Sequence, residues 1–166
     1  LMQPFWPDAA RNLMHFLGNS GKPIDMNTNG MLNDLPKLQS KVNSDIESYV
    51  DKAVKDAKNS GYAGPMTYPF VTEWQDNYAK KNENENWFYA TGGYQHATAG
   101  TITVYPDGSY TYKYQVHTAD RYNWDGNKKT GIGPLTVTDK QLQELHRAGI
   151  AQEYDLIGES TIRTGP

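Results

Sequence analysis

Apolar residues recur at three- and four-residue spacing in the first third of the chain, which is typical of amphipathic helices. A short helix is predicted from Ala9 to about Leu17, with Asp8 as its cap. NSGKPIDMNTNG follows as a predicted loop. A longer helix is predicted to begin near Pro36, a residue suited to a first helical turn, and to end at NSGYAGP. Its predicted buried face comprises Leu38, Val42, Ile46, Tyr49, Val50, Ala53, Val54 and Ala57.

The periodicity weakens between Tyr62 and Asn86, and beyond this segment it changes to two. In the weak segment GYAGPMTYPF favours turns, VTEWQDNYAKK favours a short helix, and NENEN favours a solvated connector. WFYATGG, TITVY and YTYKYQV then predict strands, with a turn at PDGS between the last two. Alternation along the third strand places Gln115 and His117 on its polar face. His117 is therefore predicted to stand at the end of a strand.

The last part of the chain predicts another strand at PLTVT and then a helix. Thr138 and Gln141 form a capping-box pattern at the start of this helix, and Gly149 suits its C-terminal cap. His146 and Arg147 fall in its last turn, where the helix dipole favours cations. YDLIGESTIR is predicted to return as an edge strand.

These patterns predict an α+β fold, in which N-terminal helices pack with a C-terminal antiparallel β-sheet and one or two further short helices. The length of 166 residues suits a single domain. We expect it to comprise a helical part at 1–61, a connector at 62–86 and a β-rich part at 87–166 with a helix at 139–148.

Composition narrows the function classes. Only 37% of the residues are hydrophobic, but twelve tyrosines and four tryptophans can still bury large areas. A net charge of -3 and a pI near 5.8 argue against a global basic field for nucleic-acid backbones. The absence of cysteine excludes disulfides and thiolate chemistry. No apolar run reaches the length of a membrane span, and LMQPFWPDAARN lacks signal-peptide features, so we expect another protein to carry the domain if it is exported.

The stretch HTADRYNWDGNKK, residues 117–129, gathers acidic, basic and aromatic side chains just beyond the predicted strand. Histidine and carboxylates suit acid-base catalysis, and nearby cations can neutralise a phosphate or a developing oxyanion. The catalytic candidates in this stretch are His117, Asp120 and Asp125, and the binding candidates are Arg121, Tyr122, Asn123 and Lys128. The alternative is a polar loop with solvated charges that is anchored in the core by Trp124.

A metal site is a further possibility for the same stretch. An EF-hand is excluded, because Gly126 at the obligatory turn would put Arg121 and Ile132 at the two terminal ligand positions. A looser Mg²⁺ or Ca²⁺ site that uses Asp120 and Asp125 stays open.

His146 and Arg147 form a second candidate catalytic group, since a helix end can reach across to the strand-end loop. The alternative role is dipole compensation with a surface ion pair. His96 and His15 are expected to be structural, and Ser160 lacks the GxSxG pattern of serine hydrolases. The sequence contains no P-loop, dinucleotide-binding glycine motif or HExxH, so hydrolysis or transfer by carboxylates, histidine and basic residues remains.

Four segments, LMQPFWPDAARN, WFYATGGYQHATAGTITV, VHTADRYNWDGNKKTGIGP and LHRAGIAQEYDLIGES, resemble the C-terminal toxin domains of bacterial polymorphic toxins. Such domains end Rhs-repeat effectors or related secreted carriers. The resemblance implies an antibacterial effector that a type VI secretion system delivers into a target cell during interbacterial competition, with periplasm or cytoplasm undecided. It implies two protein partners, a cognate immunity protein and the Rhs carrier of the same polypeptide before cleavage.

A narrower resemblance is to the colicin M family, which cuts the lipid-linked peptidoglycan precursor with an Asp-x-Tyr-Asp signature followed closely by His-Arg. Asp120, Tyr122 and the pair His146-Arg147 match in kind, whereas Asn123 replaces the second aspartate and the intervening segment is longer. Our hypothesis is that the strand-end loop and the helix with His146 and Arg147 form one hydrolase site, which acts on a phosphodiester or pyrophosphate bond in lipid II or in nucleic acid. The alternative is a non-enzymatic, pore-forming toxin that disrupts membranes with its aromatic hairpin and amphipathic helix.

Overall fold

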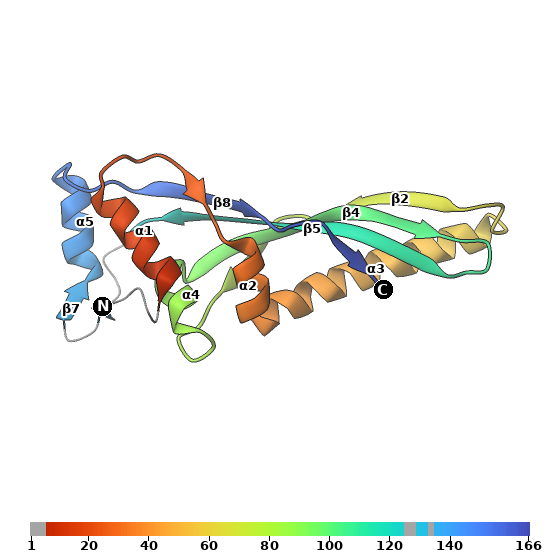
Figure 1. The fold of residues 1–166 in the computed structure, drawn as a ribbon, viewed down its shortest axis with the longest axis horizontal. Helices are drawn as coiled ribbons and strands as arrows, with labels where there is room; N and C mark the ends of the chain where they lie inside the picture. Colours follow the sequence, from red (N-terminus) through yellow and green to blue (C-terminus); the bar gives the residue numbers. More distant parts are fainter. Residues whose placement is uncertain (1–5, 125–128, 133–134) are drawn as a thin grey trace. The chain divides into compact units, whose positions relative to one another are not determined.

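The computed structural model describes the backbone of residues 6–124, 129–132 and 135–166 (Figure 1). It describes the side chains of the same residues except those of 129–132 and 135–136. Its helices are α1 (Pro7–Leu17), α2 (Thr28–Asp34), α3 (Pro36–Asn59), α4 (Glu85–Ala90) and α5 (Asp139–Arg147). Its strands are β1 (Ile24–Asp25), β2 (Met66–Val71), β3 (Gln75–Tyr78), β4 (Gly93–Val104), β5 (Tyr110–Tyr122), β6 (Lys129–Ile132), β7 (Leu135–Thr138), β8 (Tyr154–Glu159) and β9 (Arg163–Gly165). The α+β class predicted from the sequence is confirmed.

Seven of the strands form one mixed, mostly antiparallel sheet. Its main path runs β1-β8-β5-β4-β2, with β3 also paired to β4 and β9 to β5. The short pair of β1 with β8 is parallel, whereas β2 with β4 and β5 with β9 are antiparallel. β6 and β7 form a separate antiparallel pair.

The chain divides into two compact units, each built from segments that are distant in sequence. The first unit comprises Leu1–Asn27, Asp76–Gln95 and Thr118–Gly158. The second unit comprises Thr28–Gln75, His96–His117 and Glu159–Pro166. The long strands β4 and β5 contribute residues to both units, which are described separately below.

In the second unit α3 covers the sheet with the apolar face that its periodicity predicts. Its buried residues are Leu38, Val42, Ile46, Val50, Ala53 and Ala57. The ring of Tyr49 stacks on Phe70 of β2 with centroids 5.0 Å apart. β2 in turn pairs with β4 from Met66 opposite Val104 to Val71 opposite Ala99. Burial of this helical face therefore joins α3 to the sheet.

In the first unit α1 and α4 are joined by buried asparagines. The side-chain Oδ1 of Asn86 accepts hydrogen bonds from the backbone N–H groups of Asp8 (3.0 Å) and Ala9 (3.2 Å), which are at the start of α1. Asn12 donates to the carbonyl of Ala90, the last residue of α4, at 2.8 Å. These bonds satisfy helix-end groups that would otherwise lack partners, and they fix α4 against α1.

The structure corrects several local predictions. WFYATGG does not form a strand, because Asn84 caps a helix by accepting from the Trp87 N–H (3.0 Å), and β4 begins only at Gly93. Asp8 does not cap α1; Trp6 precedes the helix, and the Asp8 carboxylate accepts from Asn86 at 2.9 Å. The predicted loop before Pro36 contains β1 and α2.

The predicted connector contains two strands, β2 and β3. Pro69 within TYPF disfavours a central strand, but it is tolerated here because β2 lies at the end of the sheet path. YDLIGESTIR gives β8, which lies between β1 and β5 rather than at an edge.

Three other predictions that rest on a turn or cap mechanism are confirmed. β4 and β5 form a hairpin across PDGS, in which Gly108 has φ +83°. Thr138 and Gln141 form both bonds of the capping box of α5. Gly149, with φ +73°, follows that helix. Among the described residues no helix is long and apolar enough to cross a membrane.

Candidate functional site

β5 continues to Tyr122, five residues beyond the predicted strand end at His117. Because successive side chains of a strand point to opposite faces, Asp120 shares a face with Thr118 and Tyr122. Thr118 is fully buried and Tyr122 is 5% exposed, so this face is the inner one. His117 and Arg121 belong to the opposite face. Residues 117–122 of the stretch that looked like one polar loop are thus divided between two faces of a strand.

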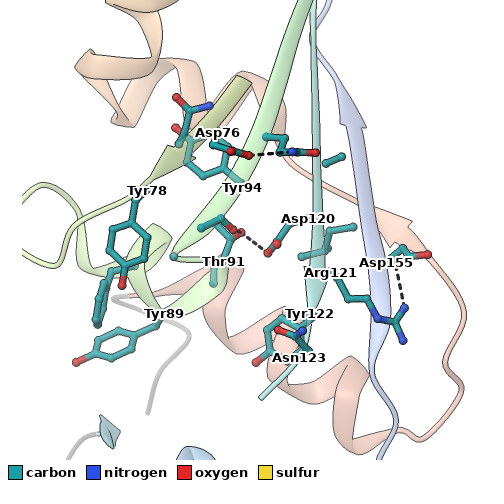
Figure 2. A pocket seen from close by; sticks show the side chains of 18 of the residues that line it. Asp76, Tyr78, Tyr89, Thr91, Tyr94, Asp120, Arg121, Tyr122, Asn123 and Asp155 are labelled. Carbon is teal, nitrogen blue, oxygen red and sulfur yellow. Dashed lines mark hydrogen bonds and ion pairs between the residues drawn. The ribbon is translucent and has the colours of Figure 1, made fainter. Parts of the chain in front are cut away.

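The inner face of β5 opens onto a pocket of about 940 Å³ within the first unit (Figure 2). The lining comes from β3, from the end of α4 and the start of β4, from the end of β5, and from Asp139 and part of β8. The lining residues that bear on the chemistry are Asp76, Tyr78, Phe88, Tyr89, Thr91, Tyr94, Asp120, Arg121, Tyr122, Asn123 and Asp155.

Asp120 is the half-buried carboxyl group of this pocket. Figure 2 shows its side chain and that of Thr91 pointing toward each other, and the Thr91 hydroxyl is hydrogen-bonded to Asp120 Oδ2. The same hydroxyl lies 2.9 Å from the carbonyl oxygen of Gly93. A carboxyl group that is held in a pocket by a fixed hydroxyl can take up or deliver a proton in a defined direction.

A second carboxyl group, Asp76, lines the same pocket from β3. It is exposed, and its Oδ1 accepts a hydrogen bond from the Gln95 side chain at 2.8 Å. Asp76 was not among the predicted site residues, because VTEWQDNYAKK favoured a helix. QDNY shows no apolar-polar alternation in the sequence, and the alternating exposure of β3 appears only in the structure.

Aromatic rings form another part of the lining. Phe88 makes edge contacts with Tyr78 and Tyr89, with centroids 6.3 and 5.0 Å apart, and Tyr78 is 45% exposed. Burial raises the pKa of Tyr94 and of Tyr122, so both phenols keep their protons at neutral pH. They can therefore serve as hydrogen-bond donors.

Arg121 points to the other side of β5. Its guanidinium donates to Asp155 at 2.9 Å (Figure 2). It also lies 3.8 Å from Glu153. The predicted helix-end histidine reaches the same group, because His146 Nε2 is 4.0 Å from Glu153 and its Nδ1 accepts from the Glu153 N–H at 3.4 Å. Helix α5 is thus linked to Arg121 through Glu153, whereas Arg147 is exposed and does not line the pocket.

The other predicted site residues have separate locations. His117 belongs to the second unit, where its Nδ1 is 3.9 Å from the Glu159 carboxylate, and it is not among the residues that line the pocket. Tyr122 and Asn123 do line it. Asp125 and Lys128 lie outside the described residues. Within the described part of the chain, no group of three or more His, Asp or Glu side chains could hold a metal ion.

The remaining histidines have structural surroundings. His96 is fully buried with Nε2 3.6 Å from Asp45, and burial lowers its pKa. His15 Nε2 donates to the Lys22 carbonyl at 2.7 Å, and its ring packs edge-on against Tyr154. Ser160 accepts from the Val116 N–H at 2.9 Å.

Comparisons with known proteins found similarity among solved structures. No family model matches the chain, and no curated protein matches it by sequence. Among solved structures, it is similar to PaeM, a colicin M-like bacteriocin produced by Pseudomonas aeruginosa, at 13% sequence identity and a TM-score of 0.46. The match covers 95% of this chain and 50% of that chain, so the present chain spans about half the length of PaeM.

Proposed function

We propose that the chain is an antibacterial toxin domain, and that the pocket of its first unit hydrolyses a phosphodiester or pyrophosphate bond in a target cell. The observation that supports this most directly is the Asp120 carboxyl group, which is held by Thr91 inside a pocket that also contains phenol donors. Pockets that combine apolar walls with a few convergent polar groups are the usual sites of small-molecule chemistry.

In this proposal Asp120 handles the proton. The oxygen of a water molecule bonds to phosphorus while Asp120 takes one proton from that water. The bond between phosphorus and the leaving oxygen breaks, and the same proton passes to that oxygen. The phenols of Tyr94 and Tyr122 are suited to donate hydrogen bonds to phosphoryl oxygens, whose charge grows as the bond breaks.

A divalent ion stays part of the proposal. Aspartate and phosphate carry like charges, so Mg²⁺ or Ca²⁺ at Asp120 and Asp125 would bring the substrate and the carboxylates together. Hydrolysis by the purified domain with and without EDTA tests this proposal. Hydrolysis that is unaffected by chelation would exclude the ion.

The route to the target rests on the resemblance of the sequence to polymorphic toxins. We propose delivery by a type VI secretion system as the end of an Rhs carrier, and neutralisation by a cognate immunity protein in the producing cell. Co-purification of the protein encoded next to this chain tests the immunity partner, and failure of that protein to protect expressing cells would contradict it.

The first test replaces the proposed proton-handling group. Asp120→Asn keeps the shape but removes the carboxylate, so we expect killing by the expressed domain to fall by about 100-fold or more. The matched control is Asp51→Asn, on the exposed face of α3 in the second unit, which should kill like the parent. Circular dichroism of the purified variants checks that both remain folded.

The same pair of variants separates the enzyme from the pore-forming alternative. A pore requires no carboxylate chemistry, so it predicts equal dye leakage from protein-free liposomes for the parent and Asp120→Asn. Undiminished killing by a folded Asp120→Asn variant would refute the proposed hydrolase.

A further inference from the structure

Thr91 makes a link that joins the end of α4 to the end of β5. Its hydroxyl is hydrogen-bonded to Asp120 Oδ2 across 29 positions of sequence, and it also lies 2.9 Å from the Gly93 carbonyl oxygen. The Gly93 carbonyl oxygen and the Asp120 carboxylate both accept hydrogen bonds, so they share the single proton that the hydroxyl can donate. Its contacts on two sides therefore determine the direction in which it faces Asp120.

The backbone around Thr91 is itself held in place. The N–H groups of Thr91 and Gly92 both donate to the carbonyl of Trp87 at 3.0 Å, which closes the last turn of α4. Trp87 is 1% exposed, so this turn is anchored in the core. Gly92 has φ +64°, and its carbonyl accepts from the Ala79 N–H at 2.7 Å. The hydroxyl at position 91 is thus carried by a backbone that several bonds fix.

The side chain adds a further restriction. Threonine branches at Cβ, so few χ1 rotamers are open to it, and reorientation of the hydroxyl would break the contacts to both Asp120 and Gly93. An aspartate at the end of a strand would otherwise lose its own rotamer freedom only when the substrate binds. A neighbour that restricts the carboxyl group beforehand reduces this cost during the reaction.

We propose that Thr91 is a positioning residue that orients the Asp120 carboxyl group in the pocket. This inference rests on the proposed function, in which Asp120 handles the proton. Thr91 acts through Asp120 and needs no contact with the substrate. Its hydroxyl, rather than its bulk, carries the effect.

The test compares two substitutions at Thr91 with a matched control. Thr91→Val keeps the shape and removes the hydroxyl, whereas Thr91→Ser keeps the hydroxyl. Thr98→Val is the control, because Thr98 is a fully buried threonine of β4 in the second unit whose hydroxyl has no hydrogen-bond partner among the described residues. Thermal unfolding of all three variants identifies any that fail to fold.

Two measurements are made on each variant. The first is the expression level of the domain, exported to the periplasm of a sensitive strain, that halves the viable counts of that strain. The second is the NMR chemical shift of the Asp120 carboxyl carbon, ¹³Cγ, at a single pH. The resonance is assigned by its absence from the spectrum of Asp120→Asn. Thr91→Val should raise the lethal dose by about 10- to 100-fold and move the resonance, while Thr91→Ser and Thr98→Val should stay close to the parent in both.

An unchanged Asp120 resonance in folded Thr91→Val would overturn the inference, and so would equal impairment of the valine and serine variants. Failure of the proposed function would be seen in a different experiment, as undiminished killing by the folded Asp120→Asn variant. The resonance needs no activity, so the two failures are distinguishable.

Discussion

At the scale of single residues, the sequence identified Asp120 and its neighbours at the end of β5, but not the pocket residues that distant segments contribute. Asp120 was a candidate because mixed polar residues followed a strand-like run. Thr91 and Asp76 carried no comparable local pattern, since each depends on a fold that brings distant segments together. His117 was grouped with Asp120 because the strand was expected to end there, whereas continued alternation places the two on opposite faces.

The buried histidine gives a prediction about pH. Burial lowers the pKa of His96 from 6.5, and this effect outweighs the nearby Asp45 carboxylate, while Lys41 adds to it. Below pH 6.5 the unfolded chain therefore binds a proton that the folded chain resists. The free energy of unfolding should fall as the pH falls from 6.5 toward the folded pKa, by at most about 1.4 kcal/mol per pH unit.

Urea unfolding at about pH 7.5 and about pH 5.5 measures this effect, since the two values bracket the ordinary pKa of histidine. His96→Gln should lose less stability between the two pH values than the parent, because it removes the titrating group. Other groups contribute equally to both proteins. An identical loss in the two proteins would show that His96 does not produce the pH dependence.

At the scale of elements, a helix or strand was predicted correctly where a single periodicity dominated its segment. The long apolar stripe of α3 and the capping box of α5 admit one interpretation, and both helices formed as predicted. The run WFYATGG suits a strand or a buried helical turn equally well, and the Asn84 cap and the burial of Trp87 favoured the helix. β2 was not predicted, and Pro69 within it is typical of turns. Proline is disfavoured in central strands but tolerated in an edge strand such as β2.

The β4–β5 hairpin supplies a prediction about strand packing. A Cβ at Gly100 would overlap the carbonyl oxygen of Lys113 and come within 2.9 Å of the Tyr114 Cα, so the two backbones leave no room for a side chain. Gly100→Ala should therefore lower the free energy of unfolding by about 1–3 kcal/mol. Gly64→Ala is the control, because nothing lies within 4 Å of its added Cβ.

Both variants are measured by urea unfolding followed by circular dichroism. Gly64→Ala should stay within about 0.5 kcal/mol of the parent. If Gly100→Ala were as stable as Gly64→Ala, the close approach of β4 and β5 at this position would be wrong.

At the scale of the whole molecule, the two compact units could not be predicted from the sequence. Each unit takes three separate segments, and four of the five boundaries fall inside strands, in β3, β4, β5 and β8, rather than in a linker. Composition and turn residues indicate boundaries only where few contacts cross them. Net charge, in contrast, needs no fold, and at -3 it argues against a substrate bound mainly through a phosphate backbone.

That charge leads to a prediction about where the domain acts. Nucleic-acid enzymes gain much of their affinity from basic surfaces that release counterions, and the chain as a whole is acidic. We therefore expect the substrate to be a phosphate ester or pyrophosphate of the cell envelope. The domain should kill when it is expressed with a periplasmic export signal, and it should be tolerated when it is expressed in the cytoplasm at the same level.

Immunoblots equalise the two expression levels, and exported Asp120→Asn shows whether killing requires the pocket rather than the burden of export. The absence of cysteine means that the oxidising periplasm forms no disulfide that the cytoplasmic protein would lack, so a difference in killing reflects access to the substrate. Death in the cytoplasm with loss of DNA or RNA would instead place the substrate among nucleic acids. In that case a local basic surface would have to overcome the acidic balance of the chain.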